Sequence, residues 1–211
     1  MNDQKAMWDQ KHSVDETLRL GTQPNVFARS VGPQLRPGQK LLELGCCIGV
    51  DASYFASLGT IVTATDFSDV IIQKNQARTT GGNPQFEVLD ISQLFPYEDG
   101  AFDAVYSHLA LHYYDDAETR AIFAEIARVL KPGGTLYFNC KSPRDPMYGD
   151  GNQIAPDIFD RNGHLRHFFS SEYTKDVLAK AFDIVKLEET QGIYDTVQCA
   201  FIDCWAKKRG V

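Results

Sequence analysis

The feature that most constrains this chain is an alternation, beginning at Lys40, of short apolar runs with stretches of helical periodicity. The runs are rich in Leu, Ile, Val, Phe, Tyr and Thr, the residues that favour strands. Such an alternation is typical of parallel strands joined by crossover helices, so we expect an α/β protein. The predicted strands cover residues 40–45, 60–66, 84–90, 102–108, 134–141, 182–189 and 196–208.

Helical patterns fill most of the intervals between these strands, and two of them start at residues suited to cap a helix. We predict helices over 50–58, 69–78, from Asp115 or Asp116 to Leu130, and from Ser170 or Ser171 to Ala181. A polar stretch with a glycine separates the last two strands, which permits an antiparallel hairpin. Because residues 196–208 are apolar on both faces, this segment is predicted to be an interior strand.

Composition excludes several classes of protein. The 211 residues fit one domain, and 43% hydrophobic with 23% charged residues is ordinary for a globular protein. A net charge of −7 argues against a nucleic-acid partner. The polar amino terminus predicts neither a signal peptide nor a membrane partner, and the cysteines show no disulfide or zinc spacing. We therefore expect a cytoplasmic protein with reduced thiols and no metal site.

The first predicted strand ends in a turn that contains Gly45 and Gly49, and a helical pattern follows it. Glycines allow close approach of a ligand to the backbone, and a helix amino terminus offers unpaired amide donors, which suits a nucleotide-like ligand. Two glycines alone are equally compatible with an ordinary strand-to-helix turn. The turn therefore becomes informative only together with its neighbours in the sheet.

Two aspartates supply that context. Asp66 closes the second predicted strand, where a carboxylate can accept hydrogen bonds from both ribose hydroxyls. Asp90 closes the third and can accept from an adenine amine, with Phe67 and Ile91 placed to sandwich the ring. Because the carboxyl ends of parallel strands meet at one edge of an open sheet, we expect these features to form one site.

Five segments together resemble the successive motifs of the class I S-adenosylmethionine-dependent methyltransferases, in order and spacing, over residues 40–141. They are ELGCCIG (43–49), TDFS (65–68), LDIS (89–92), FDAVYSHLALHY (102–113) and IARVLKPGGTLYF (126–138). The resemblance implies a Rossmann-like three-layer fold, with a seven-stranded sheet of order 3-2-1-4-5-7-6 and an antiparallel last strand. It also implies S-adenosylmethionine as cofactor and methyl transfer as activity.

The resemblance assigns roles residue by residue. It places Gly45 and Gly49 against the methionine portion of the cofactor, Asp66 on the ribose, and Asp90 with Ile91 at the adenine. Ser107 then lies beside the methyl donor. The full set of implied cofactor contacts is Glu43, Gly45, Cys46, Gly49, Asp66, Phe67, Asp90, Ile91 and Ser107.

One position departs from the family pattern, which usually reads ELGCGxG. Cys47 stands where the second glycine is expected. A left-handed conformation there would strain a cysteine by roughly 1–3 kcal/mol. We expect instead that the turn keeps φ negative at Cys47 and that the thiol packs as a small hydrophobe.

Methyl transfer from a sulfonium is an in-line displacement whose donor is already activated, so the protein mainly aligns the acceptor and excludes water. His108, just beyond the fourth strand, is the candidate for a general base or for a group that orients the acceptor. A histidine bonded to a nearby loop carbonyl is the structural alternative. His112 and Tyr113 are expected to be packing residues.

The segment 142–169 is dense in Gly, Pro, Asp and Asn and predicts a substrate lid. Its aromatic and cationic residues suggest acceptor contacts, and an arginine there can clamp a carboxylate. Predicted acceptor-binding residues are Trp8, His108, Tyr148, Arg166 and His167, with His164 nearby. Trp8 and His12 lie in an amino-terminal segment that, by the resemblance, folds back across the cofactor.

These expectations divide the single domain into an amino-terminal helical cap (1–39), a cofactor-binding core (40–141), the lid (142–169) and a final helix with a strand hairpin (170–211). The long covering segments favour a small-molecule acceptor. The alternative is a non-catalytic binder of S-adenosylmethionine or S-adenosylhomocysteine. A dinucleotide-dependent oxidoreductase is disfavoured because the turn lacks GxGxxG. The sequence does not decide between a monomer and a homodimer.

Overall fold

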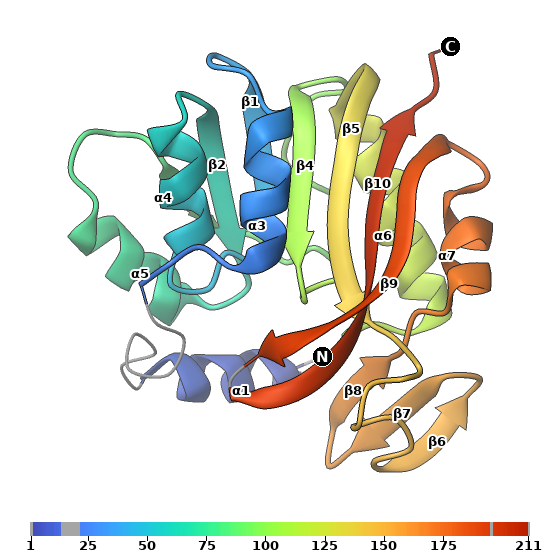
Figure 1. Ribbon diagram of the computed structural model, residues 1–211. Coiled ribbons are helices and arrows are strands. Elements are labelled where there is room, and N and C mark those ends of the chain that lie inside the picture. The colour runs from blue at the N-terminus through green and yellow to red at the C-terminus, as the bar shows by residue number, and fades with distance from the viewer. Residues whose placement is uncertain (1, 14–21, 195, 211) are drawn as a thin grey trace.

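The computed structural model describes residues 2–13, 22–194 and 196–210, and these residues build two sheets. The main sheet has seven strands in the order β3-β2-β1-β4-β5-β10-β9, as expected (Figure 1). All neighbours pair parallel up to β5, and β10 pairs antiparallel with both β5 and β9. Its strands are β1 (Lys40–Leu44), β2 (Ile61–Asp66), β3 (Gln85–Val88), β4 (Phe102–His108), β5 (Leu130–Lys141), β9 (Phe182–Tyr194) and β10 (Val197–Lys208).

Helices cover both faces of this sheet and produce two hydrophobic cores (Figure 1). One face packs residues of α3, α4 and α5, and the other packs residues of α6 and α7. Tyr106 and Phe55 represent the first core, and Phe123 and Phe138 the second. The helices are α1 (Asn2–Ser13), α3 (Val26–Val31), α4 (Val50–Ser57), α5 (Asp69–Arg78), α6 (Asp116–Val129) and α7 (Ser171–Leu178).

Local sequence accounts for the helix starts. Asp115 caps α6 by accepting the Glu118 backbone N–H, while the Glu118 side chain accepts from the Asp115 N–H, a reciprocal capping box. Ser68 and Ser170 cap α5 and α7 with their side chains, which accept the backbone N–H groups of Ile71 and Tyr173. Strand β5 starts four residues before its predicted limit, because α6 runs directly into it at Leu130.

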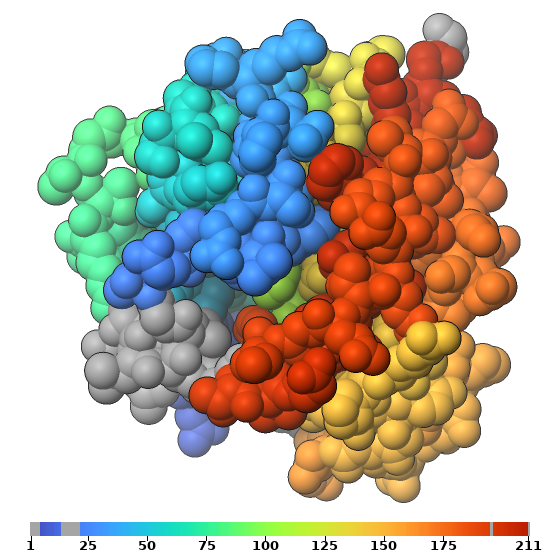
Figure 2. Space-filling view, in the orientation of Figure 1, coloured from blue at the N-terminus to red at the C-terminus, as the bar shows by residue number. Residues whose placement is uncertain are grey.

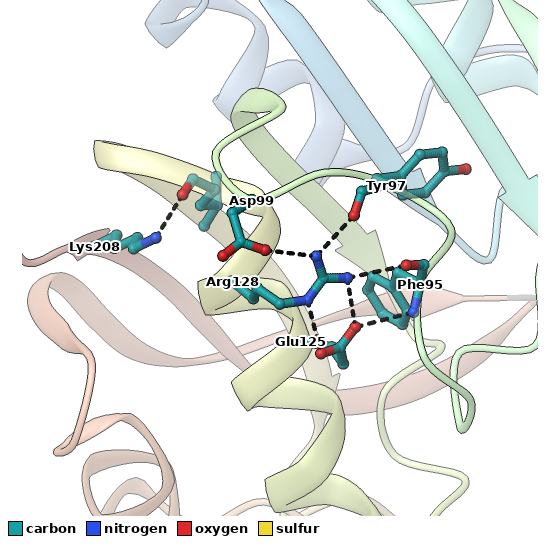
Figure 3. A network of polar contacts seen from close by, with 7 residues as sticks. Phe95, Tyr97, Asp99, Glu125, Arg128 and Lys208 are labelled. Atoms are coloured by element: carbon teal, nitrogen blue, oxygen red, sulfur yellow. Dashed lines mark hydrogen bonds and ion pairs between the residues drawn. The ribbon is translucent and has the colours of Figure 1, made fainter.

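An arginine network fixes the loop between β3 and β4 to α6 (Figure 3). The Arg128 guanidinium donates to the carbonyls of Phe95 and Tyr97 and pairs with the carboxylates of Asp99 and Glu125. The Glu125 carboxylate also accepts the Phe95 N–H. A planar group with five N–H donors can hold several loop acceptors at once, so Arg128 restrains the chain that leads into β4.

The predicted lid contains a second sheet of three short antiparallel strands, β6 (Asn152–Ala155), β7 (Ile158–Arg161) and β8 (His164–His167). It is tied to the main sheet at both ends. Ser142 donates its N–H to the Ala200 carbonyl, and Phe169 donates to the carbonyl of Lys141. The structure therefore shows a folded element here, and its closure over a substrate stays a prediction.

The carboxyl ends of the parallel strands point toward one end of the molecule, where α1 crosses below them (Figure 1). The far end of the β9–β10 hairpin and the small sheet lie next to each other at this end in the space-filling view (Figure 2). Of the predicted amino-terminal cap, residues 1 and 14–21 lie outside the described residues. Among the described helices none is long and apolar enough to cross a membrane.

Candidate active site

The glycine turn between β1 and α4 is held in left-handed conformations. Gly45 has φ +78° and Gly49 has φ +72°. A Cβ on Gly45 would lie 2.4 Å from the Ala110 Cβ, and one on Gly49 would lie 2.7 Å from the Phe86 ring. Both glycines are therefore required by the backbone and by the close approach of neighbouring elements.

Cys47 corrects the expectation for this turn, because its φ is +47° rather than negative. Two hydrogen bonds hold the residue in this conformation. Its N–H donates to Asp66 Oδ2 at 2.9 Å, and its carbonyl accepts from Asn75 Nδ2 at 2.7 Å. Side chains of β2 and α5 thus impose a conformation that a cysteine adopts only at a cost.

Asp66 lies at the end of β2, next to the turn, and is almost fully buried. One carboxylate oxygen accepts the Ser68 N–H and the other accepts the Cys47 N–H. Burial raises the Asp66 pKa, although these bonds and the charge of His12 act in the opposite direction. Each carboxylate oxygen can accept a further hydrogen bond, so the side chain fits a ligand that brings hydroxyl donors.

Glu43 on β1 is buried beside Asp66, and its Oε2 has no hydrogen-bond partner. Burial raises its pKa well above the ordinary value, and the carboxylates of Asp51 and Asp66 add to that effect. A buried acceptor without a partner is rare in folded proteins. Glu43 and Asp66 therefore fit a cofactor that carries N–H, O–H or cationic groups, as S-adenosylmethionine does.

The predicted adenine contacts lie along the same edge. Asp90 Oδ1 accepts from the backbone and the hydroxyl of Ser92, at 3.0 and 2.7 Å. Ile91 is buried in the α6 core. Phe67 is half-buried, with Lys5 Nζ of α1 5.9 Å from its ring centroid. Their contact with an adenine ring stays a prediction.

The end of β4 carries Ser107 and His108. Ser107 is fully buried and donates to the Leu44 carbonyl at 3.0 Å, which ties β4 to β1. Its place beside the methyl donor stays a prediction. The His108 ring neighbours those of Phe27 and Tyr194, with centroids 6.4 and 5.7 Å away.

The protonation of His108 bears on its predicted role. Burial, together with the nearby Lys141 cation, lowers its pKa to about 3. An imidazole with that pKa is neutral at physiological pH but holds a proton poorly. The lowered pKa disfavours the general base, and the acceptor-orienting role of His108 stays a prediction beside the structural alternative.

Helix α1 brings its predicted residue Trp8 to the loop after β4 and to β8. The Trp8 ring stacks on His12 at 5.7 Å and meets Tyr113 and His164 edge-on at 5.2 and 6.0 Å. The Arg166 side chain hydrogen-bonds Tyr113. Trp8 and Arg166, both predicted as acceptor contacts, therefore meet around Tyr113.

Two other predicted acceptor contacts lie elsewhere, which corrects the expected grouping. Tyr148 donates to Asp157 and packs on Phe159 inside the small sheet. His167 points to the opposite face of β8 from Arg166, where its ring packs 4.3 Å from that of Tyr173. The reason is the two-residue period of a strand, which sends His164 and Arg166 to one face and His167 to the other.

Sequence reasoning gave no role to two further groups near this site. His112 was expected to pack, and it is fully buried, but neither ring nitrogen has a hydrogen-bond partner. Lys141 and Asp145 form a buried ion pair of 2.7 Å, and Lys141 also donates to Cys199 Sγ at 3.3 Å. The available signal for Lys141 was a lysine at the end of an otherwise apolar strand.

The sheet order defines a Rossmann-like α/β protein, and carboxylates beside a glycine turn are typical of a ligand site at the carboxyl edge of such a sheet. Residues 42–138 match the family model described as "Methyltransferase domain". This match covers a little under half of the chain and supports its resemblance to the class I S-adenosylmethionine-dependent methyltransferases.

Curated relatives share this part of the chain. A glycine/sarcosine/dimethylglycine N-methyltransferase of Actinopolyspora halophila is 35% identical over 134 residues, covering 60% of this chain and 22% of that protein. An uncharacterized methyltransferase of Synechocystis is 36% identical over 101 residues, covering 47% and 46%. The chain thus spans less than half the length of these two relatives.

Solved structures share the fold over most of the chain. An S-adenosylmethionine-dependent methyltransferase from Methanosarcina mazei superposes with a TM-score of 0.73 at 21% identity, covering 90% of this chain and 100% of that one. The N-methyltransferase NodS from Bradyrhizobium japonicum, in complex with S-adenosyl-L-homocysteine, gives 0.68 at 22% identity and covers 97% of each chain.

Proposed function

We propose that this protein transfers the methyl group of S-adenosylmethionine to a small-molecule acceptor. The observation that carries the proposal is the juxtaposition at one sheet edge of two unlike groups. Glu43 and Asp66 form a buried carboxylate pair beside the glycine turn. Tyr113 and Arg166 lie with Trp8 at the ends of β4 and β8. The first group suits the cofactor and the second suits an acceptor.

Each group of residues has a part in that reaction. The bound cofactor supplies a methyl carbon activated by the positive charge of its sulfonium. Asp66 would hold the ribose hydroxyls, and Glu43 offers a buried acceptor to a donor group of the cofactor. His108, neutral at physiological pH, would orient the acceptor by a hydrogen bond. Alignment and exclusion of water then provide most of the rate enhancement.

Covering elements support a small acceptor. Helix α1 is fastened over the edge by bonds from Ser68 to Asp9 and from Lys74 to the His12 carbonyl, at 2.6 and 2.5 Å. The small sheet and the β9–β10 hairpin flank the same end of the molecule (Figure 2). A polymeric substrate would need an open groove there. The names of relatives, among them the glycine/sarcosine/dimethylglycine enzyme, point the same way.

The experiment is a pair of measurements on Asp66 variants. Asp66→Ala should weaken S-adenosylmethionine binding by about 1.5–3 kcal/mol, roughly 10- to 150-fold, through lost charge-assisted bonds to the ribose. Asp66→Asn keeps the shape of the side chain and separates loss of charge from distortion of the turn. Asp176→Ala, an exposed aspartate on α7, is the matched control. Calorimetry gives the dissociation constants.

A methyl-release assay over a panel of metabolites completes the test. Product formation with an acceptor supports the proposal. Tight binding of S-adenosylmethionine without release to any acceptor would favour a non-catalytic binder. An unchanged dissociation constant in Asp66→Ala would remove the ribose assignment.

A further inference from the structure

A cluster of nitrogen-bearing side chains, formed by His112, His164 and Arg166, surrounds Tyr113. The His112 ring lies 4.4 Å from the Tyr113 ring and the His164 ring lies 5.0 Å from it. Arg166 hydrogen-bonds Tyr113. Trp8 of α1 closes the group from the side of the cap, 6.0 Å from His164. Residues from three separate segments thus converge at one place.

This nitrogen cluster is short of hydrogen-bond partners. Both ring nitrogens of His112, both of His164 and Nε of Arg166 have none, although these atoms are buried. His112 is fully buried as a residue. Since buried polar groups in folded proteins are nearly always paired, five such atoms in one cluster indicate that a ligand supplies the missing partners.

The charge of the cluster defines that ligand. Burial lowers the pKa of His164 to about 4, with Arg166 and Lys11 adding to the shift, so the ring is neutral at physiological pH. Burial lowers the pKa of His112 well below its ordinary value, and the charges of Arg166 and Lys141 add to that effect. Arg166 therefore carries the cluster's positive charge. Within the described parts of the chain no carboxylate pairs with it, whereas Lys141 nearby is compensated by Asp145.

Carboxylates are gathered on the other side of the site, at Glu43 and Asp66 on β1 and β2. The cofactor half is thus acidic and the cluster half is cationic. An arginine fork held near neutral imidazoles is suited to a carboxylate or phosphate, because the guanidinium binds two oxygens and the rings offer further N–H donors.

We infer that the nitrogen cluster of His112, His164 and Arg166 binds the anionic group, carboxylate or phosphate, of the methyl acceptor. This inference rests on the proposed function. It makes the acceptor an acid, with its anion at the end of β8 and its reacting atom directed toward His108. The other source of such an anion is the carboxylate of the cofactor itself, and the experiment separates the two.

Binding of small anions to the purified protein tests the inference. The probes are acetate, benzoate and inorganic phosphate, with acetamide and benzamide as uncharged controls, titrated calorimetrically with and without S-adenosylhomocysteine. At least one anion should bind 10-fold or more tightly than the amides. Arg166→Gln should weaken that anion at least 10-fold and leave the affinity for S-adenosylhomocysteine within about 3-fold.

Matched variants control for changes in fold. Arg161→Gln lies in the same small sheet, where Arg161 is exposed and pairs with Asp150, and it should bind the anion like wild type. Arg166→Lys keeps the charge without the fork and should fall between wild type and Arg166→Gln. His164→Gln should weaken the anion several-fold. Thermal unfolding of each variant shows that it is folded.

Three results would overturn the inference. The first is failure of all three anions to bind better than the amides. The second is unchanged anion binding in Arg166→Gln. The third is a parallel loss of S-adenosylhomocysteine binding in that variant, which would show that the cluster binds the carboxylate of the cofactor. If wild type binds anions at Arg166 but neither binds the cofactor nor releases methyl groups, the proposed function fails and with it the identity of the acceptor, while the anion site stands.

Discussion

Replacing Cys47 by glycine should stabilise the protein. Relief of the left-handed strain at φ +47° is worth about 1–2 kcal/mol. Glycine costs about 0.5–1 kcal/mol through the greater freedom of the unfolded chain. Both backbone bonds of the residue, to Asp66 and from Asn75, remain possible in Cys47→Gly. The net gain lies between about 0 and 1.5 kcal/mol, and its central value of about 0.75 kcal/mol raises Tm by roughly 1.5–3 °C for a chain of this size.

The assay is thermal and urea unfolding under reducing conditions, with Cys47→Ala as control. Alanine removes the thiol but not the strain, so its free energy of unfolding should stay within about 0.5 kcal/mol of wild type. The reasoning would be refuted if Cys47→Gly were no more stable than wild type. An equal gain in Cys47→Ala would likewise refute it, because the benefit would then come from losing the thiol.

Two further predictions concern protons. His108→Gln should lower turnover by less than about 10-fold and leave the rate–pH profile unchanged, because a group with a pKa of about 3 does not titrate between pH 5 and 9; an acidic limb near neutrality that vanishes in the variant would restore the base. The raised pKa of Glu43 means that the folded state binds its proton more tightly, so its contribution to stability is lost as pH rises through the folded-state pKa. The free energy of unfolding of Glu43→Gln minus that of wild type, measured with urea, should therefore be larger at pH 8 than at pH 5. An equal difference at both pH values would contradict this.

Much of the fold could be predicted because the strands of the main sheet are apolar runs that alternate with helical patterns. The interior position of β10 followed from apolar residues on both of its faces, and the sheet order was implied by the family resemblance and confirmed. The small sheet was missed because β6, β7 and β8 have four residues each, too few for an alternating pattern to stand out among Gly, Pro and Asp.

Site residues were predictable where their position along a strand determines their location in the fold. Asp66 lies at the end of β2, beside the glycine turn, because strand ends share one edge. The conformation of Cys47 was not predictable, since it depends on contacts with Asp66 and Asn75 that are distant in sequence. That His164, and not His167, shares a face with Arg166 could not be predicted without knowing that residues 164–167 form a strand.

The antiparallel β10 gives the sheet a particular order of assembly during synthesis. Strand β5 pairs with β4 on one side and with β10 on the other, and β10 reaches Lys208. A ribosome that has released every parallel strand still leaves one border of β5 without a partner, open to pairing with another nascent chain. Protein quality control should therefore recognise products truncated within β10 more strongly than products truncated shortly after Lys208.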